Sequence, residues 1–346
     1  MNRFTRKRKN VVEMQTVMVT GGAGYVGSGV LRTLLEEGHR VVCVDKLEFG
    51  GESILDLWGH PRFAFHKVDI CDYAGFDKVL AAEKYDAVIH LAAIVGDPAC
   101  KREPDVATRI NWDASRHLVS RAIDLGVPRF AFASTCSNYG KMTDPDAFVD
   151  ESSPLAPVSL YAELKVKFEK YLLEEVRRTE HFAPVCLRFA TVYGLSPRMR
   201  FDLTVNEFTK DLALGRELEV FGPQFWRPYC HVKDFANAFS TVLKAPRETV
   251  AYKVFNVGDT SENFTKQMLI DEIRKVIPEA RIRYVDQLDD PRNYRVNCDL
   301  IRQELGFKVT RRVPDGIREV MEVVRLGIVS DPDDQRYYNI PYKRAR

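Results

Sequence analysis

The chain has 346 residues, of which 45% are hydrophobic, so it is long enough to bury a large core. Its formal net charge of +2, from 51 basic and 49 acidic residues, excludes a strong global field that would favour nucleic acid or a membrane surface. Seven scattered cysteines form no C-x-x-C pair, which argues against a metal site or a disulfide framework and predicts a cytoplasmic protein. The longest apolar stretch, near 87–95, is far shorter than the about 20 residues of a membrane span.

The chain opens with a basic segment, MNRFTRKRKN, which carries five basic side chains and is followed by no apolar block. It is therefore not a secretory signal. We interpret 1–15 as a disordered basic leader. A tether to nucleic acid or to an anionic surface is the alternative, and nothing else in the sequence supports it.

From Thr16 onward, short apolar runs alternate with helical patterns. Strands are predicted at 16–20, 40–45, 63–70, 86–94, 129–135 and 183–194, and helices at 27–38, 113–125 and 160–178. The runs are rich in Val, Ile, Ala and Phe without polar alternation, which indicates a parallel sheet covered on both faces. Right-handed crossovers then make this an α/β protein with a Rossmann-type, doubly wound parallel sheet.

Past about Ser196 the segments become irregular and richer in proline and charge. Two pieces, 233–243 and 253–257, have the helical and strand patterns of the first part. We therefore predict a dinucleotide-binding domain of 16–195 plus 233–257. A smaller, interwoven C-terminal α/β domain of 196–232 and 258–346 would bind the substrate, with a cleft between the two.

Three glycines, spaced G-x-x-G-x-x-G, follow the first predicted strand. Gly21 permits a tight turn, Gly24 lets the backbone approach a pyrophosphate, and Gly27 allows close helix packing at a helix N-terminus that binds anions. Asp45 ends the next strand, where a carboxylate accepts from ribose hydroxyls and repels a 2′-phosphate. NAD is thus favoured over NADP, although the positive charge of Lys46 beside Asp45 keeps NADP as an alternative. A strand–turn–helix with chance glycines is the alternative.

Asp69 ends the third predicted strand and reaches the same edge of the sheet. It is a candidate for contact with the adenine amino group. Taken alone, the residue is equally well explained as a cap of the following helix.

A tyrosine and a lysine stand four residues apart in SLYAELKVKFEK, so Tyr161 and Lys165 share one helix face. An ammonium beside a phenol favours phenolate, and we predict a Tyr161 pKa lowered from about 10 toward neutrality. Such a tyrosine can take a proton from a hydroxyl while hydride leaves the carbon. Ser134 and Thr135 close the preceding strand and should reach the same cleft, where Thr135 could bond the reacting oxygen. A simple strand-end turn is the alternative for these two.

Together these motifs resemble the extended short-chain dehydrogenase/reductase family, which contains sugar-nucleotide epimerases, dehydratases and reductases. The resemblance spans about 17–307, with the landmarks TGGAGYVGS, VD, DI, IHLAA, FASTCSNYG, YAELK, LRFATVYG, RPYCHVKD and DPRNYRVNCD in order. It implies a catalytic triad of Thr135, Tyr161 and Lys165, in which the lysine also holds the nicotinamide ribose. The cofactor contacts it implies are Gly21, Gly24, Tyr25, Val26, Gly27, Asp45, Lys46, Asp69, Ile70, Leu91, Ala92, Ala93, Ser134, Tyr161, Lys165 and Phe189.

The resemblance also implies arginines that bind the substrate. Arg227 matches the arginine on the substrate's diphosphate and Arg292 a second phosphate-binding arginine, a task that suits planar guanidinium groups. Arg198 and Arg200 lie in the segment expected to line the sugar-nucleotide site. By contrast, His90 and His231 are interpreted as structural residues.

Two stretches depart from the family pattern. The 4,6-dehydratases follow the catalytic threonine with an Asp-Glu pair, and this chain has Cys136 and Ser137 there, which argues against dehydratase chemistry. We interpret Cys136 as a buried thiol, not a nucleophile, because no base is placed beside it. The unusual stretch AIVGDPAC suggests that Asp97 or Cys100 faces an atypical sugar.

The leading hypothesis is an NAD-dependent epimerase that oxidises and re-reduces a ring hydroxyl, at C4, of a nucleotide-activated sugar. The alternative is an NAD(P)H-dependent 4-ketoreductase or dehydrogenase that uses the same residues. A non-catalytic nucleotide sensor or a scaffold is disfavoured, because Thr135, Tyr161 and Lys165 are all present. The resemblance further implies a homodimer that packs helices 113–125 and 160–178 of each subunit together.

Overall fold

The computed structural model describes residues 14–142, 144, 147–286 and 292–341. Most of the predicted basic leader falls outside this range.

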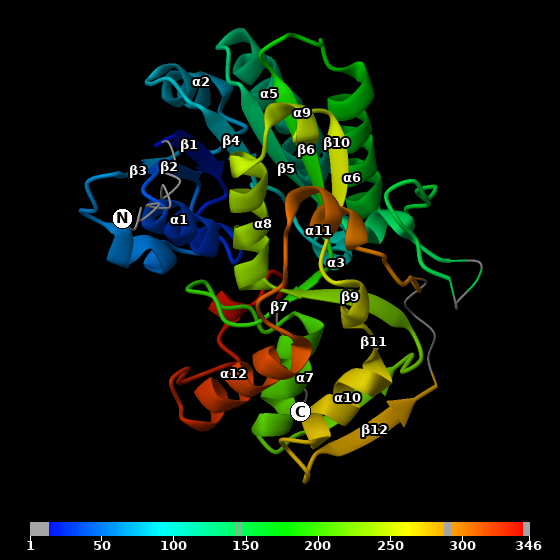
Figure 1. Ribbon diagram of the computed structural model, residues 1–346. Coiled ribbons are helices and arrows are strands. Elements are labelled where there is room, and N and C mark those ends of the chain that lie inside the picture. Colours follow the sequence, from blue (N-terminus) through cyan, green and yellow to red (C-terminus); the bar gives the residue numbers. More distant parts are fainter. Residues whose placement is uncertain (1–13, 143, 145–146, 287–291, 342–346) are drawn as a thin grey trace, which may run out of the picture.

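A seven-stranded sheet forms the upper half of the molecule (Figure 1). All of its neighbouring strands are parallel, in the order β10-β6-β5-β4-β1-β2-β3. The strands are β1 (Thr16–Thr20), β2 (Arg40–Asp45), β3 (Phe63–Lys67), β4 (Ala87–His90), β5 (Arg129–Thr135), β6 (Ala183–Phe189) and β10 (Lys253–Val257). The predicted Rossmann-type doubly wound sheet is confirmed.

Helices cover both faces of this sheet, which explains why its strands lack polar alternation. Along β1, Val17 and Val19 pack into one core with α1 (Gly27–Glu36) and α8 (Val232–Lys244). Met18, between them, packs into a second core on the opposite face. That face is covered by α2 (Tyr73–Ala81), α5 (Ser115–Asp124) and α6 (Leu160–Lys170).

Several predicted boundaries were wrong by a few residues. The helix predicted at 160–178 is α6 followed by a π-helical turn, Tyr171–Glu175. It ends there because Val176 is buried in the core with an extended backbone. The helix predicted at 113–125 begins earlier, as a π-helical segment at Arg109–Ala114 that runs into α5.

The lower half is built on two small sheets. One has the order β11 (Asn263–Thr265), β9 (Trp226–His231), β7 (Thr191–Tyr193), and the other pairs β8 (Glu217–Phe221) with β12 (Arg281–Val285). Helices α7 (Thr204–Ala213), α10 (Lys266–Arg274) and α12 (Val313–Arg325) share their core. The remaining helices are α3 (Asp97–Arg102), α4 (Pro104–Thr108), α9 (Arg247–Val250) and α11 (Asp299–Leu305).

The two halves are joined at a strand that the sequence predicted as one unit, 183–194. Its first part is β6, at the heart of the large sheet, and its second part is β7, in a small sheet. As predicted, α8 and β10 return to the large sheet, where β10 pairs with β6. The exact boundaries of the two domains stay predictions.

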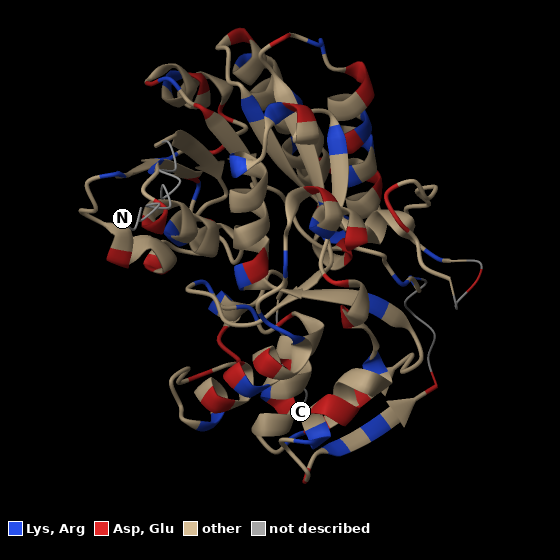
Figure 2. Ribbon diagram, in the orientation of Figure 1, with Lys and Arg blue, Asp and Glu red and all other residues tan. Residues whose placement is uncertain are grey.

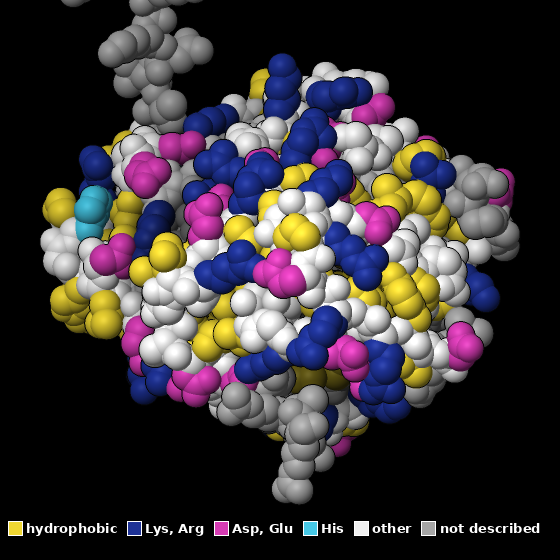
Figure 3. All heavy atoms as spheres, turned by 90° about the horizontal axis from the view of Figure 1, so that it is seen from below, with side chains coloured by type: hydrophobic (Ala, Val, Ile, Leu, Met, Phe, Trp, Pro, Cys, Tyr) yellow, Lys and Arg dark blue, Asp and Glu magenta, His cyan; other side chains and the backbone are white. Residues whose placement is uncertain are grey.

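Acidic and basic residues occur in both halves of the fold (Figure 2). Figure 2 shows acidic and basic residues interspersed along the helices of both halves, and Figure 3 shows the same mixture on the lower face. In the part of the chain that the structure describes, no helix is both long and apolar enough to cross a membrane.

Candidate active site

A cleft of about 1360 Å³ opens where the strand order reverses, between β1 and β4. At such a switch point the loops at the carboxyl ends of neighbouring strands part in opposite directions and leave a crevice. All the residues predicted to contact the cofactor line this cleft, namely Gly21, Gly24, Tyr25, Val26, Gly27, Asp45, Lys46, Asp69, Ile70, Leu91, Ala92, Ala93, Ser134, Tyr161, Lys165 and Phe189. Of the predicted substrate ligands, Asp97, Thr135, Arg198, Arg200 and Arg292 line it as well.

The glycine loop is packed too tightly for side chains. Gly21 has φ +73°, and a Cβ there would lie 2.7 Å from the backbone nitrogen of Ala92. A Cβ on Gly27 would overlap the carbonyl oxygen of Gly21. The loop therefore folds closely over the end of β4, and it leads directly into the N-terminus of α1, the positive end of the helix dipole, which suits an anion.

Asp45 is fixed beneath this loop by two backbone N–H groups. Its Oδ2 accepts from Ala23 at 3.0 Å and its Oδ1 from Leu47 at 2.8 Å. Burial raises the pKa of this carboxyl, although both hydrogen bonds act in the opposite direction. The neighbouring Lys46 is paired with Glu48 at 2.7 Å, so its charge is locally balanced.

The predicted triad comes together from β5 and α6. Thr135 is the last residue of β5, and its hydroxyl lies near enough to Tyr161, in the first turn of α6, to lower the pKa of that phenol. Lys165 lies one turn further on, and its Nζ donates to the carbonyl oxygen of Ala133 at 2.7 Å. That nitrogen is 5.9 Å from the centre of the Tyr161 ring.

The predicted lowering of the Tyr161 pKa is wrong for this arrangement. Burial raises the pKa of Tyr161 above its usual value, and the nearby Cys100 and Asp97 raise it further, while the nearby Thr135 hydroxyl lowers it. Burial also lowers the pKa of Lys165 to about 8. The i, i+4 spacing brings Lys165 close, but its ammonium is directed at a backbone carbonyl and not at the phenol.

On the substrate side of the cleft, Asp97 forms an ion pair with Arg292 at 2.8 Å. Asp97 also accepts a 2.6 Å hydrogen bond from the hydroxyl of Ser159, the N-cap of α6. A carboxylate is thus held beside the helix that carries Tyr161. Cys100, the other residue predicted to face the sugar, is fully buried and is not part of the cleft wall.

Arg227, predicted as a diphosphate ligand, lies behind the cleft wall. It is 8% exposed, and its Nη1 donates to the carbonyl oxygens of Trp226 and Arg292 at 2.6 Å each. Its guanidinium is 5.2 Å from the ring of Tyr294, which does line the cleft. In this structure Arg227 supports the wall from behind.

The two positions after Thr135 carry no carboxylate. Cys136 is 1% exposed, its thiol contacts the carbonyl oxygen of Arg188 at 3.2 Å, and burial raises its pKa. It is a buried thiol, as predicted. Ser137 lines the cleft, with its hydroxyl 3.4 Å from that of Tyr294.

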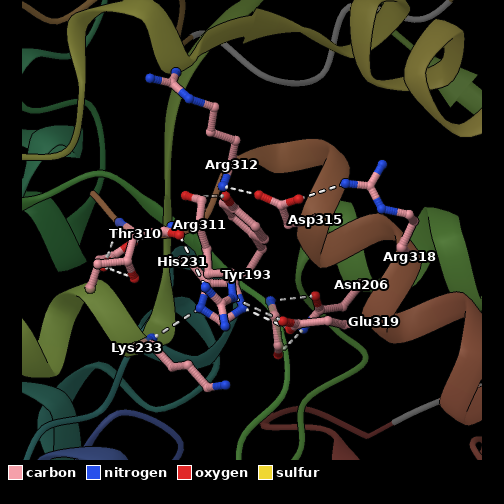
Figure 4. A network of polar contacts seen from close by, with 12 residues as sticks. Tyr193, Asn206, His231, Lys233, Thr310, Arg311, Arg312, Asp315, Arg318 and Glu319 are labelled. Atoms are coloured by element: carbon pink, nitrogen blue, oxygen red, sulfur yellow. Dashed lines mark hydrogen bonds and ion pairs between the residues drawn. The ribbon is translucent and has the colours of Figure 1, made fainter. Parts of the chain in front are cut away.

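Both histidines predicted to be structural lie outside the cleft wall. Burial lowers the pKa of His90 to about 3, and its Nε2 bonds the hydroxyl of Ser115. His231 caps α8, where its Nδ1 accepts from the backbone nitrogen of Lys233, and its Nε2 lies 3.0 Å from Glu319 of α12 (Figure 4).

Two parts of the site were not predicted from the sequence. The C-terminal segment 334–341 forms a wall of the cleft. It is held there by two hydrogen bonds, from the backbone nitrogen of Phe201 to the carbonyl oxygen of Tyr337 and from the backbone nitrogen of Asn339 to the carboxylate of Asp202. Its only sequence signal was the polar and aromatic run DPDDQRYYNI.

The second is a buried ion pair directly behind the triad. Ser134, predicted as a cofactor contact, donates its hydroxyl to Glu169 at 2.8 Å, and Glu169 pairs with Arg188. Glu169 and Arg188 are 2% and 4% exposed. The available signal was the position of Glu169, four residues after Lys165 on the same helix face.

Comparison with known proteins agrees with this geometry. Residues 17–258 match the sequence model of the NAD dependent epimerase/dehydratase family. The chain belongs to that family. It is therefore an enzyme of the extended short-chain dehydrogenase/reductase type, with a Rossmann fold and nucleotide sugars as the substrates of its class.

Within the family, the chain is similar to proteins of two activities. A dTDP-glucose 4,6-dehydratase of Shigella flexneri is 30% identical over 336 residues, which cover 88% of this chain and 91% of that protein. A UDP-glucose 4-epimerase of Rhizobium meliloti is 30% identical over 319 residues, which cover 86% and 93%. The solved UDP-glucose 4-epimerase of Thermotoga maritima, with UDP-glucose, has a TM-score of 0.79 at 26% identity and covers 90% of this chain and 99% of its own.

Proposed function

We propose that this enzyme is an NAD-dependent epimerase that inverts a ring hydroxyl, at C4, of a nucleotide-activated sugar. The observation that carries the proposal is the meeting of Thr135, Tyr161 and Lys165 with the glycine loop in one cleft. A proton-transfer group and a dinucleotide cradle are what reversible oxidation of an alcohol requires.

The residues of the cleft fit NAD. The glycine loop leaves room for a pyrophosphate at the N-terminus of α1, and Asp45 stands where the adenosine ribose would lie. Because Lys46 is paired with Glu48, its charge is locally balanced and does not favour a 2′-phosphate, which supports NAD over NADP. When bound, NAD would accept hydride from the sugar carbon and return it, and its cationic ring would favour the phenolate form of Tyr161.

The protein's own groups would handle the proton. Tyr161 removes it from the ring hydroxyl and later returns it, Thr135 holds the reacting oxygen, and Lys165 orients the nicotinamide ribose. Arg292 and Asp97 would position the nucleotide sugar from the opposite wall. Rotation of the keto sugar before hydride returns would give the epimer with no net redox change.

Dehydration is the competing chemistry, since relatives of both activities are equally similar to this chain. Loss of a C6 hydroxyl needs an acid beside the catalytic threonine. Cys136 is buried with a raised pKa, and Ser137 is a neutral hydroxyl. This supports epimerisation over dehydration.

A single experiment tests the proposal. The protein is purified, dialysed and incubated with UDP-, dTDP-, GDP- and CDP-sugars without added cofactor, and the products are followed by NMR. We expect about one NAD per chain to survive dialysis and an epimer to form. A 4-keto-6-deoxy product would identify a dehydratase instead, and a requirement for stoichiometric NADH or NADPH would identify a ketoreductase or dehydrogenase.

We also propose that the enzyme is a homodimer in which the π-helical segment and α5 pack, together with α6, against the same helices of a second copy. Light scattering should then give twice the chain mass of 39.6 kDa. A mass of one chain at micromolar concentration would contradict this.

The seven cysteines are all unpaired thiols, which supports the expectation of a reducing, cytoplasmic environment.

A further inference from the structure

Arg198 differs from the other arginines that line the cleft in having no ion-pair partner among the residues that the structure describes. It lies in the loop after β7 and is only 6% exposed, yet its Nε and Nη2 make no hydrogen bond to any residue that the structure describes. Two residues on, Arg200 is held by Asp202 through bonds of 2.8 and 3.0 Å. Arg292 has Asp97. Among the described arginines of the cleft, Arg198 is therefore the one that no carboxylate bonds, although Asp202 lies near enough to offset part of its charge.

The surroundings of Arg198 belong to the cofactor half of the cleft. Its guanidinium lies over the ring of Phe49, 4.1 Å from the ring centre, in the loop that follows β2 and Asp45. The Arg198 loop is tied to the glycine loop, because Ser196 donates to the carbonyl oxygen of Tyr25 at 2.6 Å and Tyr25 donates to that of Gly194 at 2.5 Å.

A buried cation without a partner is costly, because it loses hydration and gains no counter-charge. Burial, together with the like charge of Arg200, lowers the pKa of Arg198 to about 10, so it keeps its proton at neutral pH. A phosphate group is the ligand that compensates such a site, since its oxygens accept from the guanidinium in pairs.

We propose that Arg198 binds the pyrophosphate of the dinucleotide cofactor from the loop after β7, which is bonded to the glycine loop, with Phe49 as the platform that holds its guanidinium. This differs from the role in substrate binding that the sequence suggested. The inference rests on the proposed binding of NAD. Arg198 and the N-terminus of α1 would then both contact the pyrophosphate, and these joint contacts would retain the cofactor between turnovers.

The test compares Arg198→Met with Arg292→Met, which removes a cleft arginine on the substrate side. Release of bound NAD is followed with a coupled dehydrogenase, and binding of UDP by calorimetry. We expect Arg198→Met to release NAD about 10- to 100-fold faster, as for a lost charge-assisted bond, with the affinity for UDP unchanged. Arg292→Met should weaken UDP and leave the release of NAD as in the wild type.

The opposite pattern, with UDP weakened and NAD release unchanged in Arg198→Met, would assign Arg198 to the substrate's diphosphate and overturn the inference. Arg198→Lys keeps the positive charge but loses the planar guanidinium group, so we expect a rate of NAD release between those of the wild type and Arg198→Met. This variant replaces Arg198→Met in the test if the methionine variant does not fold. If the wild-type protein holds no NAD, the proposed function is wrong, whatever the role of Arg198. Failure of the proposed function is thus distinguished from failure of the inference about Arg198.

Discussion

Replacing Tyr161 by phenylalanine is expected to reduce turnover by about 10²- to 10⁴-fold, the usual contribution of a positioned general acid or base. The change removes the phenolic oxygen, which lies near Thr135, and leaves the ring in its place. NAD content should stay at the wild-type level, because the glycine loop and Asp45 are untouched. Turnover is measured as the rate of epimer formation, with NAD content determined on the same preparation.

Tyr171→Phe provides the matched control. Tyr171 continues the same helical segment but does not line the cleft, so the loss of its hydroxyl should leave turnover within about twofold of the wild type. Turnover in Tyr161→Phe equal to that of the control would rule out the proposed proton transfer. A loss of NAD together with activity would instead assign Tyr161 mainly to cofactor binding.

The part of the site that could be predicted from the sequence is the part set by local pattern and topology. The strand–glycine–helix spacing predicted that Gly21 and Gly27 lie in the loop before α1. Thr135 was predicted to lie in the same cleft because it ends β5, and the carboxyl ends of parallel strands share one edge of the sheet. Spacing within one helix also placed Tyr161 and Lys165 on one face. Each of these conclusions needed only a periodicity and a fold class.

The errors concern interactions that no local pattern determines. Whether the ammonium of Lys165 is directed at Tyr161 or at the carbonyl of Ala133 depends on the depth of burial of both groups. Arg227 was expected in the cleft, but its Nη1 donates to the carbonyl oxygens of the adjacent Trp226 and of Arg292, 65 residues away. The segment 334–341 is held at the cleft by tertiary contacts with residues such as Phe201, Asp202 and Lys210, which lie far away in the sequence.

The ion pair behind the triad should dominate the stability of the active-site half. Arg188→Met leaves Glu169 buried without its counter-charge, and loss of one partner of a buried pair typically costs about 3–5 kcal/mol. The pair also joins distant elements, since Arg188 donates to the hydroxyl of Tyr139, which donates to Asn256 of β10. We therefore expect a loss of this size in the free energy of unfolding, measured with urea at neutral pH.

A double-mutant cycle separates the charge effect from packing. Glu169→Gln in the Arg188→Met background removes the uncompensated charge, so the double variant should be more stable than Arg188→Met alone, against the usual trend for a second core substitution. Additive losses would show that the pair contributes only packing. Because Glu169 also holds Ser134, next to Thr135 in the chain, the double variant should regain stability without regaining full turnover. That divergence would show that the buried pair positions the triad as well as stabilising the fold.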